Sequence, residues 1–272
     1  SVVLIKIDDE SLAKINSWPI PREHYVTLVN NLWAFGARTI SFDVLFPEES
    51  KTCNAVSPDV EFAQSITNYQ GEGDKRIILA YSIEEKLPND DQGFEEVPPE
   101  LYGNMIASKN SSGIANSKVS TVVKATWPID KLLEPETDLG YLNNSEDSDG
   151  VFRYYQMVAF IDEIYFPSLG YRSYSSFTGS ADTLEVDTAG NSSIKIDNKE
   201  ISLNRNLETK IRWMGDETNF DSISLHKILN ADPQSPELKE FFKDKIVYIA
   251  STAVGAHDFR NTPINTKLPG VY

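Results

Sequence analysis

Short apolar runs alternate with segments of helical periodicity at both ends of the chain. In residues 1–83, this pattern predicts, in order, strand 2–7, helix 22–35, strand 38–42, helix 58–69 and strand 76–82. In residues 220–272, it predicts a helix that is capped by Ser224 and ends near Leu229, a helix over 236–242 and a strand over 245–250. Strands that are connected through helices form right-handed crossovers. We therefore expect a mainly parallel sheet with flanking helices, built from both ends of the chain.

The pattern changes in the middle of the chain. Residues 84–137 are rich in Pro, Asn, Ser and Glu and predict a loop so long that it is typical of a functional or mobile segment. A strand over 151–161 and a helix over 167–177 follow, and then short β segments at 183–187, 193–197, 201–203 and 208–213. The predicted fold class is α/β with a central β-rich, antiparallel insertion. We expect one domain over residues 1–272, with the α/β core in about 1–83 and 220–272 and the loop-rich and β-rich part in about 84–219.

Composition and charge narrow the classes of function. The chain has 272 residues, of which 40% are hydrophobic, as in folded globular proteins. Its formal net charge of −16 opposes binding to nucleic acid or to anionic lipid. The single cysteine, Cys53, excludes an intrachain disulfide and a cysteine metal cluster. The sequence contains no apolar run of membrane-spanning length and no signal peptide, and both of its ends are abrupt, so we expect it to be a piece of a longer protein.

Polar residues follow the predicted strands at both ends of the chain. Ligands of open parallel sheets bind outside the carboxyl ends of the strands, and the groups there would outline one crevice. The candidate ligand contacts are Asp8, Asp9, Trp18, Arg22, Asp43, Ser251, Thr252, His257, Asp258 and Arg260. These groups have a structural interpretation as well: the acids cap loops or helices or pair with Arg22 or Arg260, Arg22 bridges Asp8 or Asp43, and Trp18 plugs the end of the sheet.

Motifs for catalysis are sparse. The three histidines form no His-x-x-x-His pair, no Gly-x-Ser-x-Gly elbow is present, and the Ser251–Gly255 turn lacks the spacing of a P-loop. We therefore assign no catalytic residue, no metal ligand and no cofactor. The alternative from another class is a secreted metal-dependent hydrolase that uses Asp8, Asp43, His257 and Asp258. A third interpretation is a protein-interaction module that exposes aromatic residues of the 84–137 loop.

An ordered set of motifs carries a resemblance that covers nearly the whole chain. Its first part comprises Ile5–Leu12, Trp18–Arg22, Gly36–Arg38 and Phe42–Phe46. Its middle part comprises Leu139–Asn143, Asp149–Arg153, Phe166–Leu169 and Ile211–Gly215. Its last part comprises Lys245–Ala253, Asp258, Thr262–Pro263 and Pro269–Val271. In this order, the motifs resemble the type-two CHASE domain, the cyclases/histidine kinases associated sensory extracellular domain.

The resemblance implies a function without chemistry of its own. It implies an extracytoplasmic, periplasmic sensor domain of a bacterial membrane receptor, which is tethered to the cell membrane through segments outside this chain. Its output would be a cytoplasmic adenylate or guanylate cyclase, a diguanylate cyclase, a Ser/Thr kinase, or a histidine kinase of a two-component system. The expected partners are an unknown small-molecule or environmental signal and a second copy of the chain in a homodimer, and no nucleic acid is expected.

Overall fold

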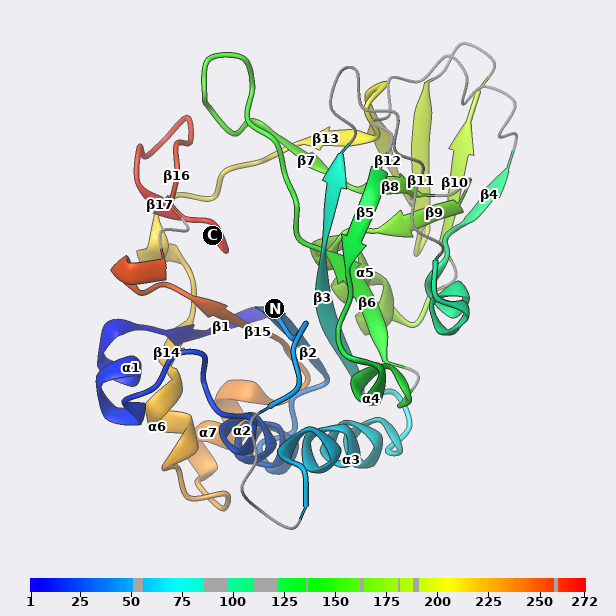
Figure 1. Ribbon diagram of the computed structural model, residues 1–272. Helices are drawn as coiled ribbons and strands as arrows, with labels where there is room; N and C mark the ends of the chain where they lie inside the picture. The colour runs from blue at the N-terminus through cyan, green and yellow to red at the C-terminus, as the bar shows by residue number, and fades with distance from the viewer. Residues whose placement is uncertain are drawn as a thin grey trace.

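The computed structural model describes residues 1–50, 56–85, 97–109, 122–135, 137–161, 164–180, 182–187, 191–256 and 259–272. Its main element is a seven-stranded sheet in the order β14–β1–β15–β2–β3–β5, with β6 also paired to β3 (Figure 1). These strands are β1 (Val2–Ile7), β2 (Thr39–Leu45), β3 (Arg76–Glu85), β5 (Val122–Thr126), β6 (Asp138–Tyr141), β14 (Ser222–Ser224) and β15 (Ile246–Ser251). Every pairing in this sheet is parallel except that of β5 with β3. The predicted α/β fold with a mainly parallel sheet is confirmed.

The two ends of the chain lie side by side in this sheet. Strand β1 pairs with β15 along its whole length, from Val2 opposite Ile246 to Ile7 opposite Ser251. On its other edge, β15 pairs with β2, and Ala250 lies opposite Asp43. The carboxyl ends of β1, β15 and β2 therefore share one edge of the sheet, as the apolar runs predicted.

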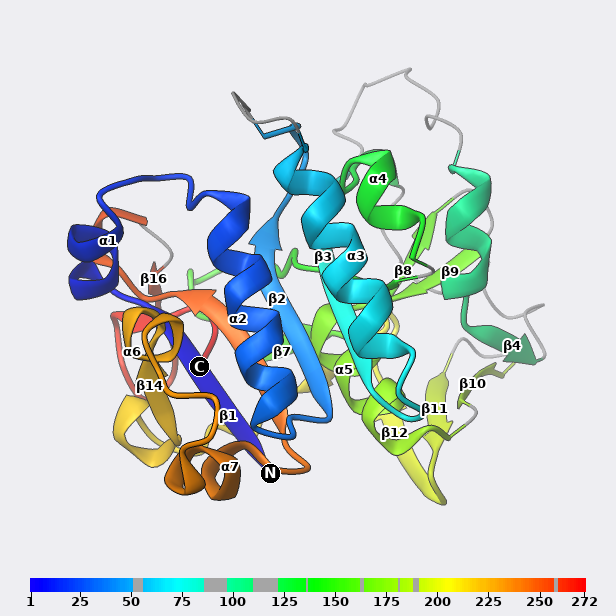
Figure 2. The same ribbon diagram turned by 90° about the horizontal axis from the view of Figure 1, so that it is seen from below.

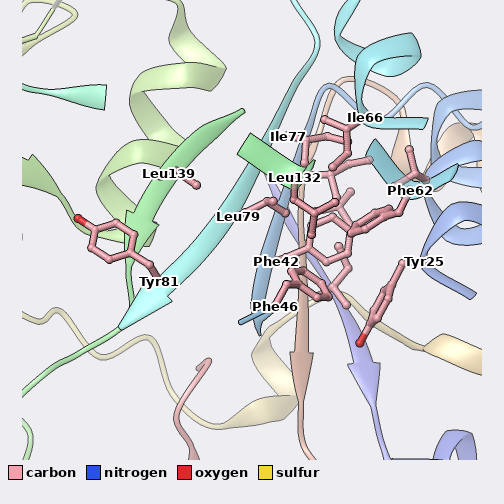
Figure 3. Packing of buried hydrophobic residues seen from close by; sticks show 14 of the residues in the cluster. Tyr25, Phe42, Phe46, Phe62, Ile66, Ile77, Leu79, Tyr81, Leu132 and Leu139 are labelled. Carbon is pink, nitrogen blue, oxygen red and sulfur yellow. The ribbon is translucent and has the colours of Figure 1, made fainter. Parts of the chain in front are cut away.

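Helices cover one face of the sheet. They are α1 (Asp9–Ile15), α2 (Arg22–Ala34), α3 (Pro58–Gln70), α4 (Asp130–Leu133), α6 (Leu225–Leu229) and α7 (Pro236–Phe242), and Figure 2 shows α2 and α3 lying across β2 and β3. The core under them contains an aromatic cluster of Tyr25, Phe42, Phe46 and Phe62, whose ring centroids lie 5.2–5.8 Å apart (Figure 3). Five of these six ring pairs are edge-on, the geometry that aromatic quadrupoles favour.

Among the described residues, one helix, α5 (Leu169–Thr178), packs on the opposite face. Small residues on this face let the helix approach closely. The Ser173 hydroxyl of α5 lies 2.7 Å from the Ser41 hydroxyl of β2, and a Cβ added to Gly140 of β6 would lie 2.4 Å from the Leu169 Cα. The two faces therefore differ, because one carries large aromatic side chains and the other carries small ones.

The middle of the chain builds a second, β-rich unit with its own core. Strands β10 (Asp182–Val186), β11 (Ser192–Ile196) and β12 (Lys199–Leu203) are antiparallel, and β4 (Ala107–Lys109) is parallel to β10. Two further antiparallel pairs are β7 (Tyr154–Gln156) with β13 (Glu208–Lys210) and β8 (Val158–Ile161) with β9 (Ile164–Pro167). The remaining elements are the short 3-10 helices η1 (Pro99–Asn104), η3 (Glu217–Asn219) and η4 (Val254–Ala256) and the pair β16 (Phe259–Arg260) and β17 (Leu268–Pro269).

Some element boundaries differ from the predicted ones. The predicted strand 151–161 is divided into β7 and β8, because Met157 between them bonds to Leu207 and Ser168 instead of continuing one ladder. Helix α1 was not predicted, because its apolar face is short and acids surround it. Within the predicted loop 84–137, the described residues form η1, β4, β5 and α4.

Closing the gap between β6 and α5 should destabilise the fold. In Gly140→Ala, the new methyl group would meet the backbone of Leu169, with contacts of 2.4 Å to its Cα and 2.7 Å to its nitrogen. We expect the free energy of unfolding to fall by about 1–3 kcal/mol, as measured by urea denaturation followed through tryptophan fluorescence. The control is Gly103→Ala, where nothing lies within 4 Å of the added Cβ. Equal stability of the two variants would contradict this packing.

Candidate functional site

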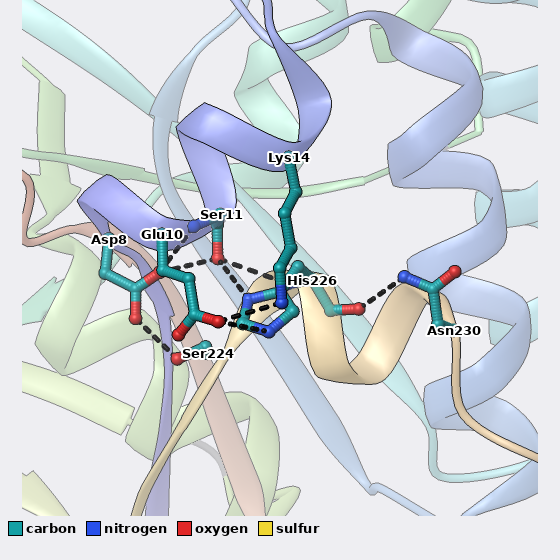
Figure 4. Close-up of polar contacts among 7 residues, drawn as sticks. All are labelled: Asp8, Glu10, Ser11, Lys14, Ser224, His226 and Asn230. Atoms are coloured by element: carbon teal, nitrogen blue, oxygen red, sulfur yellow. Dashed lines mark hydrogen bonds and ion pairs between the residues drawn. The ribbon is translucent and has the colours of Figure 1, made fainter.

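Asp8 is fully engaged by neighbouring groups at the end of β1. It is the N-cap of α1, and its Oδ1 accepts hydrogen bonds from the Ser11 nitrogen at 2.9 Å and the Ser11 hydroxyl at 2.6 Å. Its Oδ2 accepts a short hydrogen bond from the Ser224 hydroxyl (Figure 4). Burial raises the pKa of Asp8, but these hydrogen bonds together lower the pKa by more than burial raises it. The net shift of the pKa is therefore downward. Asp8 thus stays ionised and joins β1, α1 and β14.

His226 extends this network in a way that superficially resembles a hydrolase triad. Its Nδ1 lies 3.3 Å from the Ser11 hydroxyl, and its Nε2 lies 3.4 Å from Glu10 Oε1. However, the Ser11 hydroxyl donates its one proton to Asp8, and Ser11 has no exposed surface. A nucleophile must be reachable by its substrate and aligned with its base. The network is therefore structural, and it fastens α1 to the β14–α6 connection.

Arg22 forms a buried ion pair with Asp59 of α3, on the helical side of the sheet. Its Nε lies 3.0 Å from Asp59 Oδ1, its Nη2 donates to the Glu48 carbonyl at 3.0 Å, and its guanidinium lies 4.5 Å from the centre of the Phe46 ring. The expected bridge from Arg22 to Asp8 or Asp43 is wrong. The reason is that Arg22 begins α2, whose neighbour α3 carries the fully buried Asp59.

The remaining candidate residues divide into several groups. Trp18 is 57% exposed, and Asp9 is exposed in the first turn of α1. Ser251 ends β15 opposite Ile7, and the Thr252 nitrogen donates to the Ile7 carbonyl at 3.1 Å. Asp43 and Arg260 both line a cavity. His257 and Asp258, like Cys53, lie outside the described residues.

That cavity, of about 600 Å³, is the most promising site in the structure. It lies on the α5 face of the sheet, where Asp43 of β2 and Tyr248 of β15 form part of its floor. The start of α5 contributes Leu169 and Gly170, and the turn and strand around β7 contribute Phe152 and Tyr155. The segments Thr209–Trp213 and Leu268–Tyr272 complete the wall. A volume of this size, with mostly apolar walls and a few polar groups, is typical of a small-molecule site.

Two tyrosines, Tyr155 and Tyr248, contribute hydroxyl groups to the floor of the cavity. The Tyr155 hydroxyl accepts a hydrogen bond from the Gly170 nitrogen at 3.0 Å, and so satisfies an amide in the first turn of α5. Burial is the main cause that raises the pKa of both Tyr155 and Tyr248, and the negative charge of Asp43 raises it further. Both hydroxyls therefore remain protonated and can act as neutral hydrogen-bonding groups.

Sequence reasoning missed most of this lining. It found Asp43 and Arg260, but not the tyrosines or the segments around Arg212 and Val271. One signal in the sequence could have indicated Tyr248, because it is the one aromatic residue in the apolar strand β15. Its position faces α5, whereas Val247 and Ile249 belong to the core under α2.

The described part of the chain contains neither a group of metal-ligand side chains nor a membrane-spanning helix. Among these residues, no three histidine, cysteine or acidic side chains gather into a group that could hold a metal ion. In the same ranges, no helix combines the length and the apolar character that crossing a membrane requires.

Comparison with known proteins identifies one family. The model of the CHASE2 domain matches residues 1–272, the whole chain. No curated protein and no solved structure matches the chain.

Removing the Asp8 carboxylate should weaken the fold in a pH-dependent way. Asp8→Ala removes the N-cap of α1 and should lower the free energy of unfolding by about 0.5–2 kcal/mol at neutral pH. Because folding lowers the pKa of Asp8, its ionised form stabilises the protein above the ordinary value of 3.8, and this contribution is lost as the pH falls through the folded value. Asp8→Asn should therefore lose less stability than the wild type between pH 6 and pH 3 in urea denaturation. Asp9→Asn, at the exposed neighbour, should follow the wild type. Identical pH dependence of Asp8→Asn and wild type would contradict this role.

Proposed function

The chain belongs to the CHASE2 family of extracellular sensory domains, and on this basis we propose that it is the input domain of a bacterial transmembrane receptor. In this proposal, the domain lies on the periplasmic side of the cell membrane and carries out no catalysis. The receptor's cytoplasmic part is a cyclase or a kinase, and a homodimer carries the signal to it. The net charge of −16 fits this setting, because it disfavours nucleic-acid partners.

One observation carries the proposal beyond family membership. The cavity is walled on one side by the sheet and α5 and on the other by Leu268–Tyr272. A ligand in the cavity would therefore contact both the main sheet and the last residues of the chain. Binding free energy that differs between two positions of this wall would shift the balance between them, since a ligand moves an equilibrium only through such a difference.

The rival functions have less support. The hydrolase alternative needs Asp8, whose carboxylate already accepts three hydrogen bonds. The interaction-module alternative needs a large aromatic patch from residues 84–137. In the described part of that range, Tyr102 is 39% exposed, while the Trp127 ring packs 4.4 Å from the Tyr81 ring. We therefore keep the sensory function as the single proposal.

Membrane topology provides a direct test of location. We expect alkaline phosphatase fused after Tyr272 in the full-length protein to be active, because this enzyme folds only outside the cytoplasm. Green fluorescent protein at the same position should be dark when exported through the general secretory route. If the green fluorescent protein fusion were fluorescent and the phosphatase fusion inactive, the domain would lie in the cytoplasm and the proposal would be overturned.

Filling the cavity should change the output of the full-length receptor. In Val271→Trp, the indole would occupy space next to the sheet and favour one position of the C-terminal wall. We expect the basal cyclase or kinase activity to change by about 5-fold or more, the lower range of typical allosteric couplings. Ile264→Trp is the matched control, because Ile264 lies between β16 and β17, is 49% exposed and does not line the cavity. Unchanged activity of Val271→Trp would show that the cavity is not coupled to the output.

A further inference from the structure

We propose that the cavity on the α5 face binds a small organic anion, with an acidic group held by Lys210, Arg212 and Arg260 and an apolar or aromatic body over the α5 end of the sheet. This inference rests on the proposed sensory function and gives its ligand a chemical class. Three features of the cavity support it: the charge of its lining, the backbone pairing that brings its cations together, and its size.

The charge of the lining is opposite to that of the whole chain. Among the described residues, the lining contains three cationic side chains, Lys210, Arg212 and Arg260, and one carboxylate, Asp43, so their formal charge is +2. The chain as a whole carries −16. A positive lining in a negative protein concentrates anions locally and repels cations.

The three cations are brought together by backbone pairing. The Ile211 nitrogen donates to the Arg153 carbonyl at 2.9 Å, and the Phe152 nitrogen donates to the Asn261 carbonyl at 2.8 Å. The stretch 152–153 therefore lies between the segment that carries Lys210 and Arg212 and the segment that carries Arg260. Arg260 also places its guanidinium 5.3 Å from the centre of the Phe152 ring. Segments that are distant in the sequence thus supply one cationic wall.

Lys210 and Arg212 differ from Arg153, a cation nearby in the fold, in their ion pairing. Arg153, which follows Phe152 but does not line the cavity, is held by Asp147 at 2.7 Å and by Asp149 at 2.8 Å. Lys210 and Arg212, in contrast, form no ion pair with any described residue. Guanidinium and ammonium groups on a cavity wall are the usual partners of carboxylate, sulfonate and phosphate groups.

The rest of the cavity suits an apolar body. Leu169, Ile211 and Val271 contribute aliphatic surface, and Phe152 and Tyr248 contribute rings. The volume of about 600 Å³ exceeds what an inorganic ion needs and accommodates a molecule with one or two rings. Because Asp43 lies on the floor beside the tyrosines, the acidic group of a ligand belongs at the opposite, cationic wall.

A second hollow, lined by Arg38, Arg76 and Arg172, lacks these properties. Its volume is about 200 Å³. Arg38 pairs with Asp74 at 2.9 Å, and Arg172 donates to the Asn104 carbonyl at 2.6 Å. Arg38 and Arg172 are therefore already bonded to groups of the protein, and the anion site is better assigned to the larger cavity.

The test compares two fluorescent probes that differ only in charge. Anilinonaphthalene sulfonate carries an acidic group on its rings, and phenyl naphthylamine has the same rings without it. We expect the 272-residue chain to bind the sulfonate about tenfold more tightly, because three partly exposed ion contacts contribute roughly two- to threefold each. The triple variant Lys210→Gln, Arg212→Gln, Arg260→Gln should lose this preference and keep its affinity for the neutral probe.

A matched triple variant controls for net charge. Arg205→Gln, Lys227→Gln and Lys243→Gln remove three cations that are exposed and do not line the cavity, and this variant should bind both probes as the wild type does. Equal unfolding midpoints of all variants would show that differences in dye binding do not come from partly unfolded protein. Benzoate should displace the sulfonate, whereas benzylamine and inorganic phosphate should displace it poorly.

The outcomes separate this inference from the proposed function. Equal affinity for the two probes, or an unchanged preference in the cavity variant, overturns the anion site. Displacement by phosphate as effective as that by benzoate overturns the requirement for an apolar body. If the anion site falls while the phosphatase fusion is active and Val271→Trp changes the output, the sensory function stands with a ligand of another class.

Discussion

The pairing of β1 with β15 is the constraint on which the structure depends. It joins residues at opposite ends of the chain through six opposed positions, and it leaves β15 with a partner on each edge. Buried backbone groups must be hydrogen-bonded, so β15 can occupy the interior of the sheet only when both β1 and β2 are in place. Its alternating side chains then fix the two faces: Val247 and Ile249 join the large core, and Tyr248 points to the side where α5 and the cavity lie.

The cavity follows from the unequal covering of the two faces. Large residues such as Phe42 and Phe62 fill the space under α2 and α3. On the other face, Ser41, Ala80 and Gly140 let α5 approach closely, but one helix covers only part of the sheet. The remaining part, near β15 and the end of β2, is roofed by residues 209–213 and 268–272. A hollow under such a roof is a consequence of layer packing, and the residues around it determine what can occupy it.

Much of the α/β fold could be predicted from the sequence, and the site could be predicted only in part. Apolar runs such as 2–7 and 245–250 reveal buried strands without knowledge of their partners. Asp8 shows why polar groups are harder to interpret: its partner Ser11 is local, but its partner Ser224 is 216 residues away and no pattern along the chain relates the two. Arg212 reaches the cavity because β13 pairs with β7, and that register is specified by tertiary packing.

The polar groups of this protein fall into two classes that differ in freedom to move. Those around Asp8 and Arg22 are bonded to several partners and tie helices to the sheet, so moving them would leave buried charges uncompensated. The cationic wall, in contrast, is held by strands of two and three residues, β16, β17 and β13, on which Lys210 and Arg260 are exposed. Regions with few buried contacts open at the lowest free energy. A ligand between the sheet and this wall would therefore displace the wall, and the sheet would act as the fixed reference.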